Sequence, residues 1–276
     1  MDFVRKVAID IKNLKIQGAQ RIAEAAIVAW KKAKNKNKAY RLLVNARPTE
    51  PMLRNVLKLL KNGFDPDKLL TKLEKDKEKI RKMGSKKIKD NYIVYTHCHS
   101  STVVSILKEA KRKRKKFLVH LTETRPLYQG RITAKELSEA KIPVVLFVDS
   151  AARIALKKAD IMVIGADAIT AEGIVINKIG SELFAEVAYR YDIPVYVCTH
   201  SFKFDPMTYF GWDEKIEKRF EKEVWKNPPK GVRINNFAFE KIKPQLITGI
   251  ISELGVLKPE VFVEAVIKKY PWMVKE

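Results

Sequence analysis

The second half of the chain alternates short apolar runs with amphipathic segments, and this alternation constrains the fold more than any other feature. Near-continuous apolar strands separated by helices are typical of a parallel sheet covered on both faces. We therefore predict a Rossmann-like α/β domain with a mainly parallel sheet, although no G-x-G-x-x-G dinucleotide fingerprint follows its first strand. The strands are expected at 92–97, 117–123, 144–149, 161–165, 195–199 and 246–251. The helices are expected near 101–113, 133–141, 150–158, 178–191 and 259–269.

The first half of the chain is expected to be helical throughout. From Phe3 to Lys82 apolar residues recur at helical spacing, and Thr49, in the polar turn between two prolines, is a candidate helix cap. The pattern breaks at 82–90. We predict an N-terminal all-helical domain over 1–88 and a Rossmann-like domain over 89–276 that carries the ligand pocket and the oligomer contacts.

Composition narrows the class of protein. A chain of 276 residues with 46% hydrophobic content can bury a full core, and two cysteines cannot form a disulfide framework. Neither an apolar run long enough to span a membrane nor a signal peptide is present, so we expect a cytoplasmic protein without membrane contact. Charged residues make up 32% of the chain and are rich in Lys, as on the surfaces of thermophilic proteins.

The net charge of +23 raises the question of nucleic acid binding. The basic residues are spread along the chain, and the run Lys111–Lys116 suits the solvated C-terminal turn of a helix, where cations complement the dipole. We favour that interpretation over an RNA site, which stays as the weaker alternative.

Polar groups follow several of the predicted strands, where α/β sheets place their chemistry. Cys98 ends the first strand and precedes a helix that Ser100 or Ser101 caps, and a helix N-terminus stabilises a thiolate. The alternative is a buried structural cysteine. Asp167 ends another apolar run, where a carboxyl group resists ionisation unless a nearby cation stabilises its negative charge. A thiol and a carboxyl at one sheet edge would form an acid/base pair.

The candidate cations are Lys178 and Lys203, which follow strand-like segments and could bind phosphate as point charges. The cluster His97, Cys98 and His99 has no second cluster that would complete a tetrahedral site, so we expect no metal. We expect no cofactor either.

An ordered set of motifs resembles the alpha, beta and delta regulatory subunits of translation initiation factor 2B. The same superfamily contains ribose-1,5-bisphosphate isomerase and methylthioribose-1-phosphate isomerase. The resemblance covers nearly the whole chain, and it implies a helical N-terminal domain, a Rossmann-like C-terminal domain and assembly through the latter. Its motifs are Thr96–Cys98, Thr122–Pro126, Gly165–Asp167, Ile176–Gly180, Ser201–Phe204 and Glu253–Leu257, with Ile16–Ala19 and Ala46–Thr49 in the helical half.

Within the isomerases, the resemblance implies that Cys98 and Asp167 carry the proton transfers. A sugar 1-phosphate has no free hemiacetal, so its isomerisation needs an acid at the ring oxygen and a base at the C2 hydrogen. The resemblance also implies phosphate and hydroxyl binding by Gly18, Arg47, Asn177, Lys178 and Lys203.

Two departures from the isomerase pattern stand out. Gln17 lies before Gly18 where an Arg is expected, which removes a bidentate phosphate ligand. His99 stands where the isomerases carry Asn, which affects substrate orientation.

Two functions follow. The first is a regulatory-subunit-like homologue of initiation factor 2B that binds translation initiation factor 2 and keeps a sugar-phosphate or nucleotide pocket. The second is an aldose-ketose isomerase for ribose 1,5-bisphosphate or methylthioribose 1-phosphate, acting through Cys98 and Asp167. A sensor that binds ligand without turnover is a third, weaker alternative. We rank the translation factor slightly first.

The end of the chain predicts assembly. Apolar residues between Ile247 and Ile267 supply more apolar surface than an edge strand and one terminal helix need. We expect a homodimer or a higher homo-oligomer.

Overall fold

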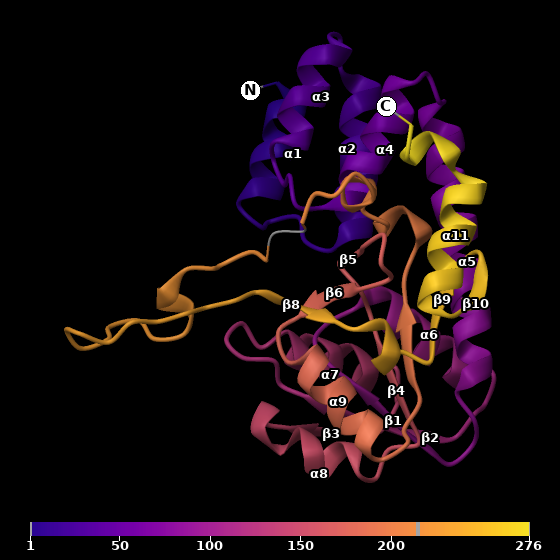
Figure 1. The fold of residues 1–276 in the computed structure, drawn as a ribbon, viewed down its shortest axis with the longest axis vertical. Coiled ribbons are helices and arrows are strands. Elements are labelled where there is room, and N and C mark those ends of the chain that lie inside the picture. The colour runs from indigo at the N-terminus through magenta and orange to yellow at the C-terminus, as the bar shows by residue number, and fades with distance from the viewer. Residues whose placement is uncertain (1, 214–215, 276) are drawn as a thin grey trace.

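The computed structural model describes residues 2–213 and 216–275. The chain begins with a group of helices, which lies at the top of Figure 1, and continues into an α/β body below it. The N-terminal helices are α1 (Phe3–Lys12), α2 (Ala19–Lys32), α3 (Lys36–Val44), α4 (Pro51–Lys61) and α5 (Pro66–Lys87). The predicted helical half is therefore present.

Local sequence explains where these helices begin. Asn35 and Asp65 accept hydrogen bonds from the main-chain N–H groups of Lys38 and Lys68, so each caps the helix that follows it. The prediction that Thr49 caps α4 was wrong by one residue. Glu50 occupies the cap position without a side-chain capping bond, because Pro51 starts the helix.

A seven-stranded sheet forms the centre of the described α/β part, in the order β10-β9-β7-β4-β1-β2-β3. All neighbouring strands run parallel except β9 and β10. The fold class, an α/β protein with a mainly parallel sheet, is confirmed. The strands are β1 (Tyr92–Thr96), β2 (Phe117–Thr122), β3 (Val144–Phe147), β4 (Ile161–Ile164), β7 (Val195–Cys198), β9 (Gly249–Ser252) and β10 (Gly255–Leu257).

Helices cover both faces of this sheet. One apolar cluster joins α5, α6 (Ser101–Arg112) and α7 (Gln129–Glu139) to one face. The other cluster joins α8 (Ala152–Leu156), α9 (Ser181–Arg190) and α11 (Pro259–Lys269) to the opposite face. This second cluster continues into α1 to α4, so the helical half and the sheet share one core. The division into domains at 88 and 89 remains a prediction.

A second, antiparallel sheet lies beside the first and was not predicted. Its order is β5-β6-β8, with β5 (Ala168–Ile169), β6 (Val175–Lys178) and β8 (Phe239–Ile242). The sequence prediction of a helix from 178 was wrong at its start, because β6 runs to Lys178 and α9 begins at Ser181. Strands this short carry too little alternation to be recognised from one sequence.

After β7 the chain forms the short helix α10 (Pro206–Tyr209). Between α10 and β8 an arm leaves the body, visible in orange at the left of Figure 1. The arm contacts the body through Arg125, which donates to the main-chain oxygen of Val224 at 3.0 Å. Arg47 and Glu217 form an ion pair at 3.8 Å. Aromatic residues of the arm such as Phe220 and Trp225 are exposed.

The surplus of apolar surface expected at the end of the chain was wrong for most of its residues. Ile250, Val263 and Val266 are buried in the protein's own core, because α11 turns back onto the sheet and the helical half. Val256 and Val261 are exposed. In the residues that the structure describes, no helix is both long and apolar enough to cross a membrane.

Candidate active site

A cavity of about 400 Å³ lies where the helical half meets the carboxyl edge of the parallel sheet. Its wall combines the start of α2, the turn before α4, the loop from β1 to α6, the loop from β4 to β5, and the end of β6. Every site residue predicted from the sequence lines it: Gly18, Arg47, Cys98, Asp167, Asn177, Lys178 and Lys203. The structure therefore brings these residues together, while their roles stay predictions.

Cys98 is held in an unusual main-chain conformation. Its φ of +63° lies in the left-handed region, which non-glycine residues rarely adopt. Its N–H donates to Thr124 Oγ1 at 3.0 Å, and its carbonyl accepts from Thr133 Oγ1 at 2.9 Å. Side chains that follow β2 and belong to α7 thus fix the thiol at the cavity wall, with Ser100 capping α6 behind it.

Asp167 reaches the same wall because the end of β4 lies close to the start of α6. A Cβ atom on Gly165 would come within 2.7 Å of Ser100 Oγ, so only glycine permits this approach. The Asp167 N–H donates to the Ile176 carbonyl at 2.8 Å, which anchors the residue to β6.

The two lysines take different places. Lys203 Nζ donates to the main-chain oxygen of Ala166, the residue before Asp167. Lys178 Nζ lies 4.9 Å from the centre of the Phe239 ring. The neighbouring Asn177 is buried and donates to Ser181 Oγ at 2.9 Å, which fixes the turn between β6 and α9.

Burial decides the ionisation of the thiol. Desolvation raises the pKa of Cys98 to about 11, and the positive charge of Lys178 opposes this rise only in part. Burial therefore acts against the thiolate that the start of α6 was expected to stabilise.

The two histidines beside Cys98 have different surroundings. His97 is buried, with Nδ1 at 2.7 Å from Thr122 Oγ1 and Nε2 at 2.9 Å from the Ile179 carbonyl, and burial lowers its pKa to about 4. It acts as a neutral structural residue. His99 lines the cavity, where Nδ1 lies 3.0 Å from Thr133 Oγ1, and burial lowers its pKa.

Several cavity residues escaped the sequence analysis. One of them is Arg21, in the first turn of α2. Gln17, which the sequence analysis did name, donates its side-chain amide to the Leu14 carbonyl at 2.7 Å. Glu50 and His200 directly adjoin the motifs Ala46–Thr49 and Ser201–Phe204, but the predicted site did not include them. The cavity cations are Lys15, Arg21, Arg47, Lys178 and Lys203, and its carboxyl groups are Glu50, Glu136 and Asp167.

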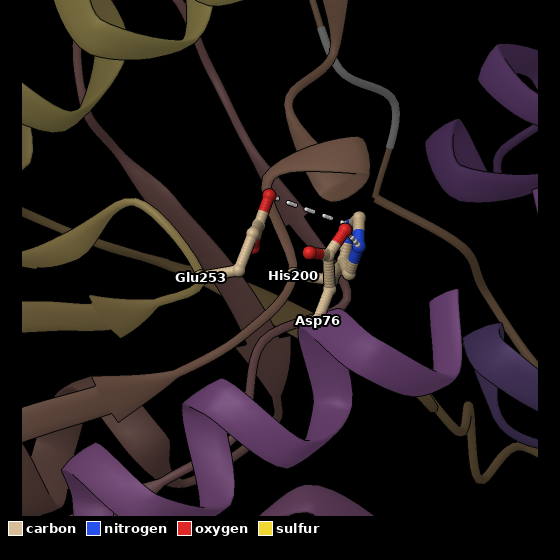
Figure 2. Close-up of side chains that lie close together, drawn as sticks. All are labelled: Asp76, His200 and Glu253. Carbon is tan, nitrogen blue, oxygen red and sulfur yellow. Dashed lines mark hydrogen bonds and ion pairs between the residues drawn. The ribbon is translucent and has the colours of Figure 1, made fainter. Parts of the chain in front are cut away.

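A second group of titratable side chains lies behind His200. Figure 2 shows Asp76, His200 and Glu253 pointing toward one another, with ligand-type atoms all within 4.8 Å of each other. The Phe202 N–H donates to His200 Nδ1 at 3.0 Å, so Nε2 carries the proton that is donated to Asp76 at 3.3 Å. Lys72 contacts the same carboxylate.

This group is best described as an ion-pair network, because the Lys72 ammonium already supplies the positive charge that a metal would bring. Burial by itself would raise the pKa of Asp76, but hydrogen bonds from His200 and Lys72 outweigh it and hold the pKa at about 2. The network ties α5 to the segments that follow β7 and β9.

Fold and cavity together define a Rossmann-like α/β protein with a helical N-terminal half and a cation-lined cavity at the carboxyl edge of its sheet. The model of the Initiation factor 2 subunit family matches residues 15–259, and the chain belongs to this family. The resemblance predicted from the motifs is thus confirmed.

Individual relatives sharpen the comparison. A Methanocaldococcus jannaschii protein named ribose 1,5-bisphosphate isomerase is 36% identical over 301 residues, covering 100% of this chain and 98% of the relative. A Pyrococcus furiosus protein named putative translation initiation factor eIF-2B subunit 2-like is 34% identical over 206 residues, covering 75% of this chain and 70% of the relative. The crystal structure of a Pyrococcus horikoshii translation initiation factor eIF-2B superposes with a TM-score of 0.81 at 28% identity, covering 94% and 98% of the two chains.

The comparisons correct the first predicted function. The relatives named ribose 1,5-bisphosphate isomerase include five more besides the M. jannaschii protein, and these five are 31% to 36% identical and cover at least 93% of this chain. Ranking a regulatory subunit that binds initiation factor 2 above an isomerase was therefore wrong. The motifs that suggested the regulatory subunits are shared across the superfamily, so they could not separate the two functions.

Proposed function

We propose that the protein is a ribose-1,5-bisphosphate isomerase, which forms ribulose 1,5-bisphosphate. One observation carries the proposal: a single cavity combines Cys98 and Asp167 with cations from both halves of the chain. A thiol and a carboxyl can move the two protons of an aldose-ketose conversion. The full-length relatives with that name support the same reaction.

The reaction balances without any further reactant. As Asp167 gives a proton to the ring oxygen, the bond from C1 to that oxygen breaks, and the Cys98 thiolate takes the C2 hydrogen to leave an enol. Asp167 then accepts the proton of the C2 hydroxyl while the C2 carbonyl forms. The Cys98 thiol returns its proton to C1. Each group ends in its starting state, as catalysis requires.

The thiolate that this step needs must form against the desolvation that raises the pKa of Cys98. Lys178 lowers that pKa and stabilises the thiolate. Arg47, Lys178 and Lys203 bind phosphate oxygens, Gly18 offers its main chain at the start of α2, and Asn177 binds a hydroxyl. Arg21 supplies a cation near the place where Gln17 replaces the expected Arg.

The charge of the cavity favours a bisphosphate over methylthioribose 1-phosphate. Two phosphates carry up to about four negative charges, which the lysines and arginines of the wall can neutralise. A methylthio group would instead require one end of the cavity to be apolar. The apolar lining of the cavity is limited to single side chains such as Met52, Ile132 and Phe239.

The activity is tested by incubating the purified protein with ribose 1,5-bisphosphate and following the product by phosphorus NMR. We expect conversion to ribulose 1,5-bisphosphate, with a kcat/KM about 100-fold or more above that for methylthioribose 1-phosphate. Absence of turnover with the bisphosphate, under conditions in which the protein is folded, would contradict the proposal.

We also infer a homodimer. Exposed apolar side chains occur on the edge strand β3, just after it, and on the helices α8 and α9, namely Val145, Leu146, Val148, Ile154, Leu183 and Tyr189. The helix α8 follows β3 in the chain and packs against α9. Large apolar patches are rare on monomers, and we assign a second copy of the chain as the partner of this surface.

A further inference from the structure

Glu50 is a buried acid in the cavity wall that the proposed reaction does not use. The residue is 3% exposed, and Oε1 has no hydrogen-bond partner among the described residues. Although it occupies the cap position of α4, its side chain makes no capping bond. A buried polar atom without a partner costs free energy, and a ligand that donates a hydrogen bond to Oε1 would remove this cost.

The charges around Glu50 place it beside the reacting groups. Lys203 exerts the largest attraction on its carboxylate, Asp167 repels it, and Arg47 and Arg54 attract it more weakly. Burial outweighs these attractions and raises the pKa of Glu50 to about 7. The group therefore presents an oxygen that can accept a hydrogen bond when ionised and donate one when protonated.

The chemistry of the substrate limits what this oxygen can bind. An ionised carboxylate repels phosphate, so Glu50 faces the part of the ligand that carries hydroxyl groups. The ring form of ribose 1,5-bisphosphate has free hydroxyl groups only at C2 and C3. The proposed reaction oxidises C2 and passes the proton of its hydroxyl to Asp167, which leaves the C3 hydroxyl.

We propose that Glu50 is a specificity-determining residue that binds the C3 hydroxyl of the phosphorylated sugar through Oε1. The bond holds the ring so that C1 and C2 face Cys98 and Asp167. This inference rests on the proposed function for the identity of the ligand. It assigns to Glu50 the positioning of the sugar, while the proton transfers stay with Cys98 and Asp167.

The test is a cycle of two proteins and two substrates. Wild type and Glu50→Ala are each assayed with ribose 1,5-bisphosphate and with its 3-deoxy analogue. We expect wild type to lose about 10- to 100-fold in kcat/KM on the 3-deoxy analogue, the usual effect of removing a hydrogen bond to a charged group. For Glu50→Ala, the kcat/KM values of the two substrates should agree within about 3-fold.

Two further variants separate binding from a structural effect. Glu50→Gln keeps an acceptor oxygen without the charge, so it should retain part of the discrimination between the two substrates. In this variant the ratio of the two kcat/KM values should no longer change with pH near about 7. Glu136→Gln changes another carboxyl of the cavity, one that pairs with Lys108 at 3.4 Å, and should keep the full discrimination of wild type. If Glu50 had only a structural role, Glu50→Ala would lower kcat/KM equally for both substrates and leave the ratio of the two values as in wild type.

The outcomes distinguish this inference from the proposed function. If wild type turns over the bisphosphate and Glu50→Ala discriminates as strongly as wild type, the role of Glu50 is overturned and the isomerase stands. If wild type shows no turnover, the isomerase fails, and the same cycle is measured as Kd by calorimetry. If wild type binds the bisphosphate more tightly than the 3-deoxy analogue and Glu50→Ala binds the two equally, the hydroxyl contact is supported. If both proteins have the same ratio of Kd values, or if neither sugar binds, the contact is overturned.

Discussion

At the residue scale, the local conformation of Cys98 is the clearest sign of a functional position. A left-handed main chain at a non-glycine residue costs about 1 kcal/mol or more, and surrounding contacts must hold it in place. Here Thr124 and Thr133 supply these contacts from two different elements. The strain therefore serves to place the thiol at the cavity, which agrees with the proposed role as a base.

Replacing this thiol tests the role directly. We expect Cys98→Ser to lower kcat by about 100-fold or more, because a hydroxyl is a far weaker acid than a thiol, while the Kd for the bisphosphate changes little. Cys198→Ala is the matched control, since Cys198 is buried in the sheet and lies outside the cavity. Steady-state kinetics and calorimetry give the two quantities, and unchanged turnover in Cys98→Ser would remove the thiol from the mechanism.

Glu50 should also affect the dependence of stability on pH. Its pKa is raised from the ordinary value of 4.5 to about 7, so its contribution to stability is complete below the lower value and is lost as the pH rises through the higher one. The loss amounts to about 3 kcal/mol at most. We expect Glu50→Gln to show no such loss, and to be more stable than wild type at about pH 8.

Guanidinium unfolding of both proteins between about pH 5 and 8 measures this difference. All other carboxyl groups are common to the two proteins, so they cancel in the comparison. Parallel stability curves would show that Glu50 ionises in the folded protein as it does in the unfolded chain.

At the element scale, α5 joins the two halves of the molecule. Its inner face packs on α6 and on the sheet, and Asp76 pairs with His200 at the cavity wall. One helix thus contacts both the core and the segment that supplies Lys203. Changes in α5 are therefore expected to affect the cavity through His200.

Removing the charge of Asp76 tests this connection. Asp76→Asn leaves His200 and Lys72 without their carboxylate, and we expect a loss of about 2 kcal/mol in the free energy of unfolding. The estimate lies below that for a fully buried pair because the Lys72 side chain stays 27% exposed to solvent. Glu78→Gln, which changes an exposed carboxyl of the same helix, should cost less than about 0.5 kcal/mol. Chemical denaturation compares the two variants, and equal effects would contradict the network.

At the scale of the whole molecule, the inferred homodimer predicts a definite mass in solution. We expect light scattering in moderate salt to give the mass of a dimer, with salt present to screen the net charge of +23. Ile154→Glu, on the exposed face of α8, should yield monomers, because it places a charge in the inferred contact. Val261→Glu, also exposed but on α11, should leave the dimer intact. A monomeric wild type, or the opposite response of the two variants, would contradict the inferred surface.

The sequence alone determined the class of fold and the residues at the ends of the strands. Apolar runs such as Ile161–Ile164 and the helical spacing before Lys82 are local patterns, and local patterns specify strands and helices. The parallel order of the strands then brings Cys98 and Asp167 to the same edge, which is why the candidate site could be predicted without coordinates.

Only the tertiary structure decided what surrounds these residues. Glu50 and Arg21 come from the helical half, and neither carries a motif that would reveal that it faces Asp167 or Cys98 across a cavity. Burial raises the pKa of Cys98, although the adjoining helix start predicted a thiolate. Solvation and electric field depend on atoms distant in the chain, and a pattern of neighbouring residues contains no information about them.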